Sequence, residues 1–204
     1  DKDGIMDSFD TNTIQRGSPR DLNRKLYLDF DGRNDYAEDT QILSGLASAT
    51  LMAWIDLNST FSANGVVIGQ DKFNIRVLNN RRIRATVNGK TLDYTTSLDI
   101  SRWYHVAAVL GSGQLKIYVN GTLVAARALN ETIQADTTKL TLGKNPNASN
   151  TFFKGKIDEV RVFNAELSLD QIKRIVHQEI ENNSGQIRGT VIPQNIGSLP
   201  FNRL

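Results

Sequence analysis

The sequence predicts an all-β domain, a two-sheet antiparallel sandwich followed by one short helix. Between residues 26 and 163, short runs alternate apolar and polar side chains, which is the period of half-buried strands. Glycine and asparagine separate these runs, and a convincing helical pattern of apolar residues occurs only after residue 168. A chain of 204 residues matches one domain, since domains typically have ~100 to 200 residues.

The candidate strands are ten short runs that suit a sandwich of two sheets. Each run is rich in β-branched, aromatic or other apolar residues at alternate positions. They cover residues 26–30, 50–57, 66–68, 73–77, 82–87, 103–110, 114–119, 123–128, 140–142 and 156–163.

Two sharp turns are predicted where Asn-Gly pairs separate alternating runs. Asn88-Gly89 and Asn120-Gly121 suit two-residue type I′ turns, because both residues tolerate a positive φ. The Gly-Ser-Gly link at residues 111–113 is expected to fold one strand back onto the next in the same way.

The predicted helix covers residues 169–178 and begins with a capping box. Ser168 and Gln171 have the spacing for reciprocal hydrogen bonds with the backbone, and Leu167 and Ile172 have the spacing of a hydrophobic staple. The helix carries its apolar residues on one side, so we expect it to lie against the edge of the sandwich.

Both ends of the chain differ in composition from its middle. Residues 1–24 and 181–204 are polar with little periodicity, which is typical of linkers, so the predicted domain covers residues 25–180. Because Asp1 is no natural start, we expect the chain to be part of a larger multidomain protein.

Charge and composition exclude several classes of function. The 24 basic and 22 acidic residues leave a net charge of +2 without a strong basic cluster, so nucleic acid is not expected as a partner. Arg81, Arg82 and Arg84 are interpreted as a solvated strand end. No apolar stretch approaches the ~20 residues of a membrane span, so no membrane insertion is expected. The absence of cysteine excludes a disulfide scaffold and a thiol nucleophile.

Four ordered motifs carry a resemblance to a known family. They lie at residues 28–36, 103–108, 115–121 and 157–163, the last followed by Leu167-Ser168. Together they resemble the laminin-G-like jelly roll of the concanavalin A-like lectin and glucanase superfamily over residues 25–180. The resemblance implies two antiparallel sheets packed face to face, and its relatives at cell surfaces imply glycan or protein ligands.

The two ends add weaker resemblances. Asp1, Asp3, Gly4, Asp7 and Asp10 have the spacing of a calcium loop and look like the tail of a thrombospondin type 3 repeat. An acidic terminus without metal is the alternative interpretation. Residues 186–204 are similar to the segment that leaves such domains in very large bacterial surface proteins. A secreted or cell-surface location is therefore expected.

The resemblance also implies a structural calcium ion that joins the start of the first strand to the last strand. Asp158 matches the family position in the last strand, and Asp31, Gly32 and Asn34 are plausible oxygen donors from the other end. The alternative interpretation is that Asp31-Gly32 is a turn pair and that Asp158 pairs with Arg161.

Enzyme activity is not expected. Glycosidases of this superfamily place their acid and nucleophile on one strand with the spacing E-x-D-x-E or E-x-D-x-x-E, and this sequence contains no such pattern. Asp158 and Glu159 are adjacent and would point to opposite faces of a strand. A divergent polysaccharide-active enzyme remains a third hypothesis.

Recognition of a carbohydrate or an extracellular protein, as in cell adhesion, is therefore the preferred hypothesis, and a ligand-free structural spacer is the second. Binding residues concentrate on loops held by a stiff scaffold, and sugar sites combine aromatic rings with planar polar groups. Trp54 and Trp103 have core-like neighbours. The candidate ligand-binding residues are Phe61, Tyr94, Asn145, Asn147 and Phe152.

Overall fold

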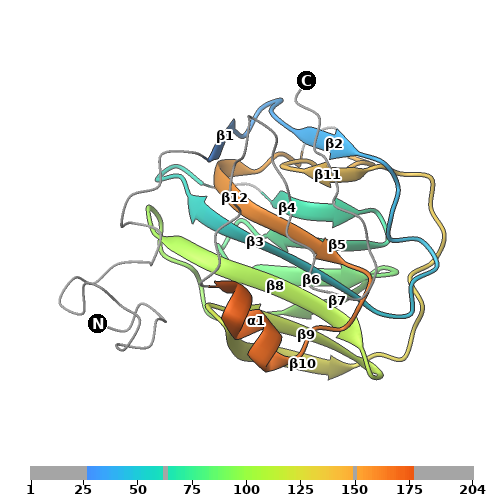
Figure 1. The fold of residues 1–204 in the computed structure, drawn as a ribbon. Helices are drawn as coiled ribbons and strands as arrows, with labels where there is room; N and C mark the ends of the chain where they lie inside the picture. The colour runs from blue at the N-terminus through green and yellow to red at the C-terminus, as the bar shows by residue number, and fades with distance from the viewer. Residues whose placement is uncertain (1–26, 62–63, 149–150, 177–204) are drawn as a thin grey trace, which may run out of the picture.

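The computed structural model describes residues 27–61, 64–148 and 151–176, and these residues form two stacked sheets and one helix (Figure 1). Each sheet has six strands, and neighbouring strands are antiparallel throughout. The expected all-β jelly-roll sandwich is confirmed. The segments 1–24 and 181–204, including the predicted calcium repeat, lie outside the described residues.

Sheet A contains the strand order β1-β12-β3-β8-β9-β10, and sheet B contains β2-β11-β4-β5-β6-β7. The strands of sheet A are β1 (Leu28–Asp31), β12 (Lys154–Phe163), β3 (Ala49–Leu57), β8 (Trp103–Gly111), β9 (Gln114–Val119) and β10 (Thr122–Ala128). Those of sheet B are β2 (Ala37–Asp39), β11 (Leu140–Leu142), β4 (Gly65–Gln70), β5 (Phe73–Val77), β6 (Ile83–Val87) and β7 (Lys90–Asp93).

The main core lies between the two sheets. Alternate residues of each strand point into it, for example Leu51 and Ile55 from β3 and Phe73 and Ile75 from β5, all fully buried. Because burial of apolar side chains is the dominant favourable contribution to folding, this alternation fixes which side of each strand faces outward. Strands β2 and β7 are not among the predicted strands.

The three predicted tight turns are confirmed. Asn88 and Gly89 join β6 to β7 with φ values of 49° and 78°, and Asn120 and Gly121 join β9 to β10 with 48° and 72°. The link between β8 and β9 turns at Ser112-Gly113, where both φ values are also positive. These are the backbone angles that a type I′ turn requires.

The helix α1 (Leu169–Val176) begins as the sequence predicts. The Ser168 N–H donates to Gln171 Oε1 at 2.8 Å, and the Gln171 N–H donates to Ser168 Oγ at 3.3 Å, which completes the capping box. The helix lies near the edge strand β10, as expected, and it also extends over the outer face of sheet A. Ile172 and Ile175 pack with Trp54 in a second apolar cluster on the outer face of sheet A, in front of which α1 lies in Figure 1.

Strand β10 forms one edge of sheet A. Its pairing with β9 is interrupted by a register shift between Leu123 and Ala125. Further along the strand, an Nη1 N–H of Arg127 donates to the carbonyl oxygen of Thr91 in β7, at 2.7 Å, and so links the two sheets along this side. Leu123 remains 46% exposed.

No described helix is long and apolar enough to cross a membrane.

Candidate functional site

The outer face of sheet B is the candidate functional site. Phe73, Ile75 and Val77 of β5 point into the core, so Asn74 and Arg76 point outward. The same alternation places Arg84 and Thr86 of β6, Asp93 of β7, Thr141 of β11 and Glu38 of β2 on this face. The outer face of sheet A is different, because α1 packs on it over Trp54 and its neighbours. Asn74, Thr86 and Thr141 are nevertheless buried. The planar groups that sheet B presents from its rigid scaffold are therefore those of half-buried Arg76, Arg84 and Asp93.

Arg84 and Asp93 form the strongest ion pair on this face. They are directly opposite each other in the β6–β7 ladder, and two N–H groups of Arg84 donate to the two carboxylate oxygens at 2.6 and 2.7 Å. This bidentate contact with Arg84 lowers the pKa of Asp93 and raises the pKa of Arg84. The charge of Arg84 is thus largely neutralised within the protein.

Arg76 has a neutral partner instead. Its Nε and Nη2 groups donate to Asn74 Oδ1 at 3.2 and 3.1 Å, and the Asn74 Nδ2 group donates to the carbonyl oxygens of Gln70 and Asp71. The amide of Asn74 is therefore held with its oxygen toward Arg76. Burial, followed by repulsion from Arg84, lowers the pKa of Arg76 from the usual arginine value, although the group stays charged at neutral pH.

The described residues of the segment 143–153, namely 143–148 and 151–153, lie beside β4 and form one side of the site. The Gly143 N–H donates to the carbonyl oxygen of Val67 at 3.2 Å, and the Phe153 N–H donates to the carbonyl oxygen of Gly143 at 2.8 Å. Two of the predicted ligand-binding residues, Asn145 and Asn147, lie in this loop, and the Asn147 N–H donates to Asn145 Oδ1. We call this segment the 143–153 loop.

The 143–153 loop is connected to the charged end of the face through Asp71. The Lys72 Nζ atom lies 2.9 Å from Asp71 Oδ2, and this hydrogen-bonded ion pair lowers the pKa of Asp71. Burial opposes the shift, and a hydrogen bond from the Asn147 side chain adds to it. Since Asp71 lies in the turn between β4 and β5, this contact brings the predicted residue Asn147 to the end of the strand that carries Arg76.

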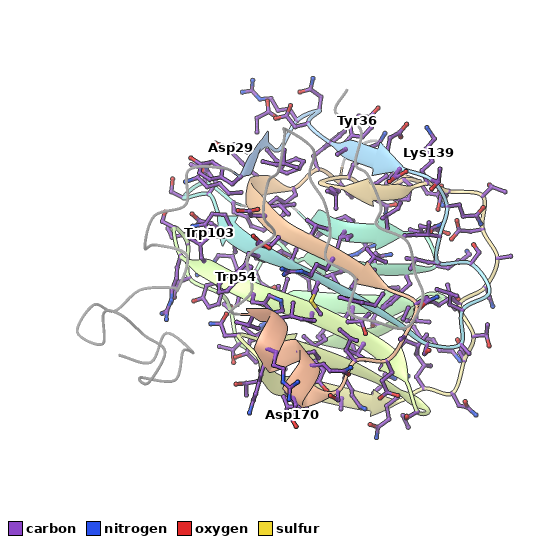
Figure 2. All side chains as sticks on the ribbon, viewed as in Figure 1. Asp29, Tyr36, Trp54, Trp103, Lys139 and Asp170 are labelled. Atoms are coloured by element: carbon purple, nitrogen blue, oxygen red, sulfur yellow. The ribbon has the colours of Figure 1, made fainter. Side chains whose placement is uncertain are left out.

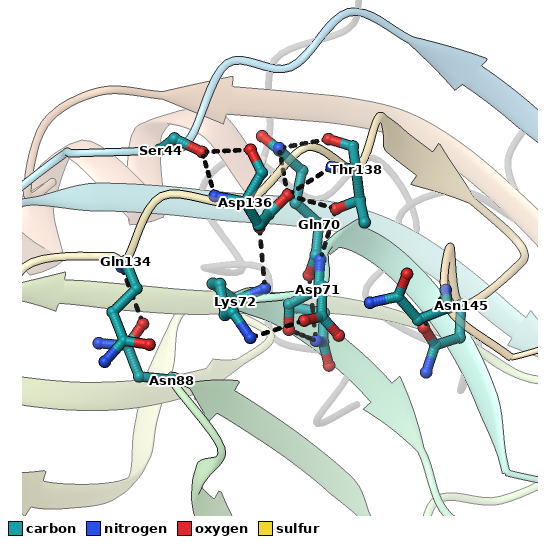
Figure 3. A network of polar contacts seen from close by, with 11 residues as sticks. Ser44, Gln70, Asp71, Lys72, Asn88, Gln134, Asp136, Thr138 and Asn145 are labelled. Carbon is teal, nitrogen blue, oxygen red and sulfur yellow. Dashed lines mark hydrogen bonds and ion pairs between the residues drawn. The ribbon is translucent and has the colours of Figure 1, made fainter.

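The same end of sheet B is fixed by a polar network, drawn in Figure 3. Buried Gln70 accepts from the N–H groups of Ile42 and Leu43 and donates to the carbonyl oxygen of Thr138 at 2.7 Å. Asp136 accepts from the N–H groups of Thr138 and Lys72. These contacts use the carboxylate of Asp136 to hold the loop before β11, so we interpret the network as structural.

Two other predicted ligand-binding residues lie elsewhere. Phe61 is buried at 7% exposure, with its ring centroid 5.9 Å from that of Phe153, so the expectation that it is exposed is wrong. Tyr94 is half-buried and packs against the main core, near the start of β6. Phe152 lies in the 143–153 loop and is also half-buried. The structure therefore brings Asn145, Asn147 and Phe152 together in the 143–153 loop. It buries Phe61 against Phe153 of the same loop and places Tyr94 elsewhere.

The predicted calcium ligands do not meet. Asp31, Gly32 and Asn34 lie at and just beyond the end of β1, where Asp31 is opposite Lys154 in the ladder with β12. Asp158 is four residues further along β12, which corresponds to ~13 Å at ~3.3 Å per residue. The side chain of Lys154 also packs against Gly32. The four residues therefore do not fit one ion.

Asp31 has a local structural role instead. One of its carboxylate oxygens accepts from the Arg33 N–H at 2.7 Å, while its own N–H donates to Asp35 Oδ2 at 2.9 Å. These contacts are those of a turn stabilised by aspartate side chains. Within the described parts of the chain, no three acidic or histidine side chains are grouped to hold a metal ion.

Sequence reasoning missed an aromatic ring at the edge of this face. Tyr36 directly precedes β2, is 39% exposed, and has the Lys144 ammonium 4.2 Å from its ring centroid. Figure 2 shows Tyr36 and Lys139 at the β2 edge, away from Trp54 and Trp103 on sheet A. Ala37 faces the core, so alternation directs Tyr36 toward the outer side, a signal that was present in the sequence.

These features define a jelly-roll sandwich with one sheet face under a helix and the other lined with polar side chains. Residues 31–173 match the laminin G family described as the concanavalin A-like lectin/glucanases superfamily. The chain therefore belongs to this superfamily, as the sequence motifs indicate. No curated protein matches the chain significantly in sequence.

Solved structures share the fold at low sequence identity. A candidate carbohydrate-binding protein from Bacteroides ovatus is 22% identical with a TM-score of 0.62, and the match covers 73% of this chain and 47% of that protein. A heptameric SAP-like pentraxin from Limulus polyphemus is 17% identical with a TM-score of 0.59, covering 72% and 80%. This chain thus spans about half the length of the Bacteroides ovatus protein.

Proposed function

We propose that this domain is a non-catalytic binding module that recognises carbohydrate on the outer face of sheet B, beside the 143–153 loop. The observation that carries the proposal is the set of oriented planar groups on this face, namely the Arg76 guanidinium, which buried Asn74 holds in place, and the Arg84–Asp93 pair. Planar amides and guanidinium groups suit the paired hydroxyls of a sugar, and a rigid sheet reduces the entropy lost on binding. The description of the Bacteroides ovatus structure supports the same class of ligand.

The carboxylates of this face support a role without catalysis. A glycosidase needs one carboxyl group whose pKa is raised so that it can protonate the leaving group. Cationic neighbours instead lower the pKa values of Asp71 and Asp93. Glu38 is paired with Lys139. Each of these three carboxylates is therefore paired with a cation that favours its ionised form, whereas the acid of a glycosidase must hold its proton.

A glycan array tests this proposal against a ligand-free spacer. We expect at least one glycan to bind above background. The affinity of the domain for that glycan, measured by isothermal titration calorimetry, should be lower in Asn147→Ala. Asn164→Ala, an exposed asparagine beyond β12 and outside sheet B, is the matched control and should bind like the parent protein. An array without any bound glycan would contradict the proposal and favour the spacer.

A second assay tests for hydrolysis. Each bound polysaccharide is incubated with the domain, and new reducing ends are measured over time. We expect none above the buffer control. Release of reducing ends that disappears in Asp93→Asn or Asp71→Asn would contradict the non-catalytic assignment and support the polysaccharide-active alternative.

We also propose that the domain works in adhesion as part of a larger secreted or cell-surface protein. The calcium-repeat spacing of Asp1 to Asp10 supports this setting, because such repeats join modules of adhesive proteins. On the strength of the family resemblance, we also propose a calcium ion in the domain itself, with Asp158 as a ligand. Asp31 lies too far along the ladder to bind the same ion. Protease treatment of intact producing cells, followed by detection of the domain, tests the location.

A further inference from the structure

The outer face of sheet B carries more positive than negative charge near its centre. Arg76 and Arg84 are direct partners in the β5–β6 ladder. Arg82 precedes β6, and because Ile83 faces the core, alternation directs Arg82 outward as well. It lies close enough to Asp93 to help lower the pKa of that carboxyl group. Arg82 and Arg84 thus lie near Asp93, whereas Arg76 lies beside Arg84 with Asp71 further along the strand.

The positive charge of Arg76 is available to a ligand. Its Nε and Nη2 groups both donate to one neutral acceptor, Asn74 Oδ1, and among the described residues no carboxylate forms an ion pair with it. Because Nε and Nη2 are engaged, the two N–H groups of Nη1 are left for a ligand. The orientation of the guanidinium is thereby fixed before any ligand arrives.

The positions of Arg76 and Arg84 lower the stability of the sheet, and unfavourable groups of this kind are often kept where they bind a ligand. Like charges directly opposite each other on two strands are destabilising, and Arg76 and Arg84 occupy such positions. The Nε atom of Arg82 is also buried without a hydrogen-bond partner. A negatively charged group bound beside Arg76 and Arg84 would relieve the repulsion between these two side chains.

We propose, building on the carbohydrate-binding function above, that the ligand is an acidic polysaccharide whose uronate carboxylate binds Arg76. A planar carboxylate matches the fork of guanidinium N–H groups. The face suits one carboxylate on each sugar rather than a dense phosphate chain. Asp93 already neutralises Arg84, and Asp71 and Glu38 are paired with Lys72 and Lys139. The positive charge that remains on β5 for a ligand is that of Arg76, which is too little for closely spaced phosphates.

The experiment compares an acidic sugar chain with its neutral form. Oligosaccharides of galacturonate, glucuronate and mannuronate are titrated into the domain at low salt, each beside its methyl ester, which removes only the charge. We expect at least one acid form to bind about tenfold or more tightly than its ester, since a hydrogen bond to a charged group is worth that factor or more. Raising the salt concentration should reduce this difference.

Variants then assign the contact. Arg76→Gln is expected to weaken binding of the acid form about tenfold and to weaken binding of the ester much less, because glutamine keeps planar hydrogen-bonding groups but has no charge. Arg76→Lys should fall in between, because lysine keeps the charge and loses the fork. Arg174→Gln removes the same charge from an exposed position of α1, on the opposite side of the sandwich, and should bind like the parent protein. The melting temperature of Arg76→Gln should not be lower than that of the parent protein, which separates lost binding from unfolding.

Three results would overturn the inference while leaving carbohydrate binding intact. They are equal binding of acid and ester forms, unchanged acid binding in Arg76→Gln, and binding of a sulfated galactan without binding of any uronate. If no sugar of any kind binds, neutral glycans of the array included, the proposed function itself is wrong.

Discussion

Arg84 and Asp93 face each other across strands β6 and β7, and their pairing sets the charge that Arg76 meets on the next strand. Both side chains are about one third exposed, so solvent screens the pair and its net contribution is ~0.5–1 kcal/mol. The pair also shields Arg76 from the full charge of Arg84, with which it is in direct register. One carboxylate therefore affects both the stability of the sheet and the field above it.

Asp93→Asn is expected to lower the free energy of unfolding by ~1 kcal/mol at neutral pH. The pKa of Asp93 is lowered in the folded protein, so its stabilising contribution is present above the unfolded pKa of ~3.9 and is lost as pH falls through the folded pKa. Urea unfolding of both proteins at pH ~7 and ~2.5 measures this. The difference should disappear in acid, and exposed Asp29→Asn should show little difference at either pH. An equal deficit at both pH values would show that the carboxylate charge is not the cause.

Single residues of the site were only partly predictable from the sequence. Asn145 and Asn147 were identified because an Asn-rich segment between strands is typical of a surface loop. Phe61 was misplaced because its polar neighbours suggested exposure, whereas its ring packs on Phe153, distant in sequence. Arg76 was missed because its significance depends on Arg84, which only the register of β5 with β6 brings opposite it.

At the scale of elements, the strands of sheet A and the inner strands of sheet B were predictable, and the two edge strands of sheet B were not. Strand β3 has nine residues with a clear apolar pattern, whereas β2 and β7 have three and four residues with polar sequences. An edge strand pairs along one side, so its sequence need not carry a full apolar pattern. The helix and its place near the edge were predicted, but the face it covers was not, because this face depends on the tertiary position of Trp54.

Two glycines with the same backbone angle are expected to respond differently to substitution. Gly89 and Gly143 both have φ near +78°, but a Cβ at Gly89 meets no atom within 4 Å, whereas one at Gly143 would lie 2.4 Å from the ring of Phe30. Gly89→Ala should cost ~1 kcal/mol for the left-handed backbone alone. Gly143→Ala should cost roughly 3 kcal/mol or more, because the core must also shift. Chemical denaturation measures both, and equal losses would show that the contact with Phe30 is relieved without cost.

The cap of α1 offers a test of the helix itself. Ser168→Ala removes the oxygen that accepts from the Gln171 N–H, and should lower the free energy of unfolding by ~1 kcal/mol. Ser59→Ala, an exposed serine in the turn after β3, is the control and should change stability little. If both variants melt alike, the capping box contributes nothing measurable to the stability of the domain.

For the whole molecule, the two outer faces differ in what covers them and in their charge. The outer face of sheet A packs against α1 and builds a second apolar cluster, which adds stability. The outer face of sheet B carries the oriented arginine and amide groups and has an unfavourable pair of like charges. The all-β class and the jelly roll followed from sequence motifs, but this division depends on which face the last helix covers.

Calcium binding is a prediction that concerns the stability of the whole domain. An ion that binds only the folded state stabilises it by mass action, by ~2.7 kcal/mol when its concentration is 100 times Kd. We therefore expect the melting temperature to fall in excess chelator, and Asp158→Asn to remove this dependence. Asp31→Asn should retain it, because the two residues are ~13 Å apart along the ladder of β1 with β12. A melting temperature that is the same with calcium and with chelator would contradict the prediction.

The irregular edge of β10 affects whether two copies of this domain can pair edge to edge. An uninterrupted outer strand is a template on which a second molecule adds its own strand, and such additions lead to aggregates. The register shift after Leu123 breaks that template, and Arg127 places a cation near its far end. A neighbouring copy therefore meets a mismatched, charged edge at β10, which disfavours the joining of two domains into one continuous sheet there.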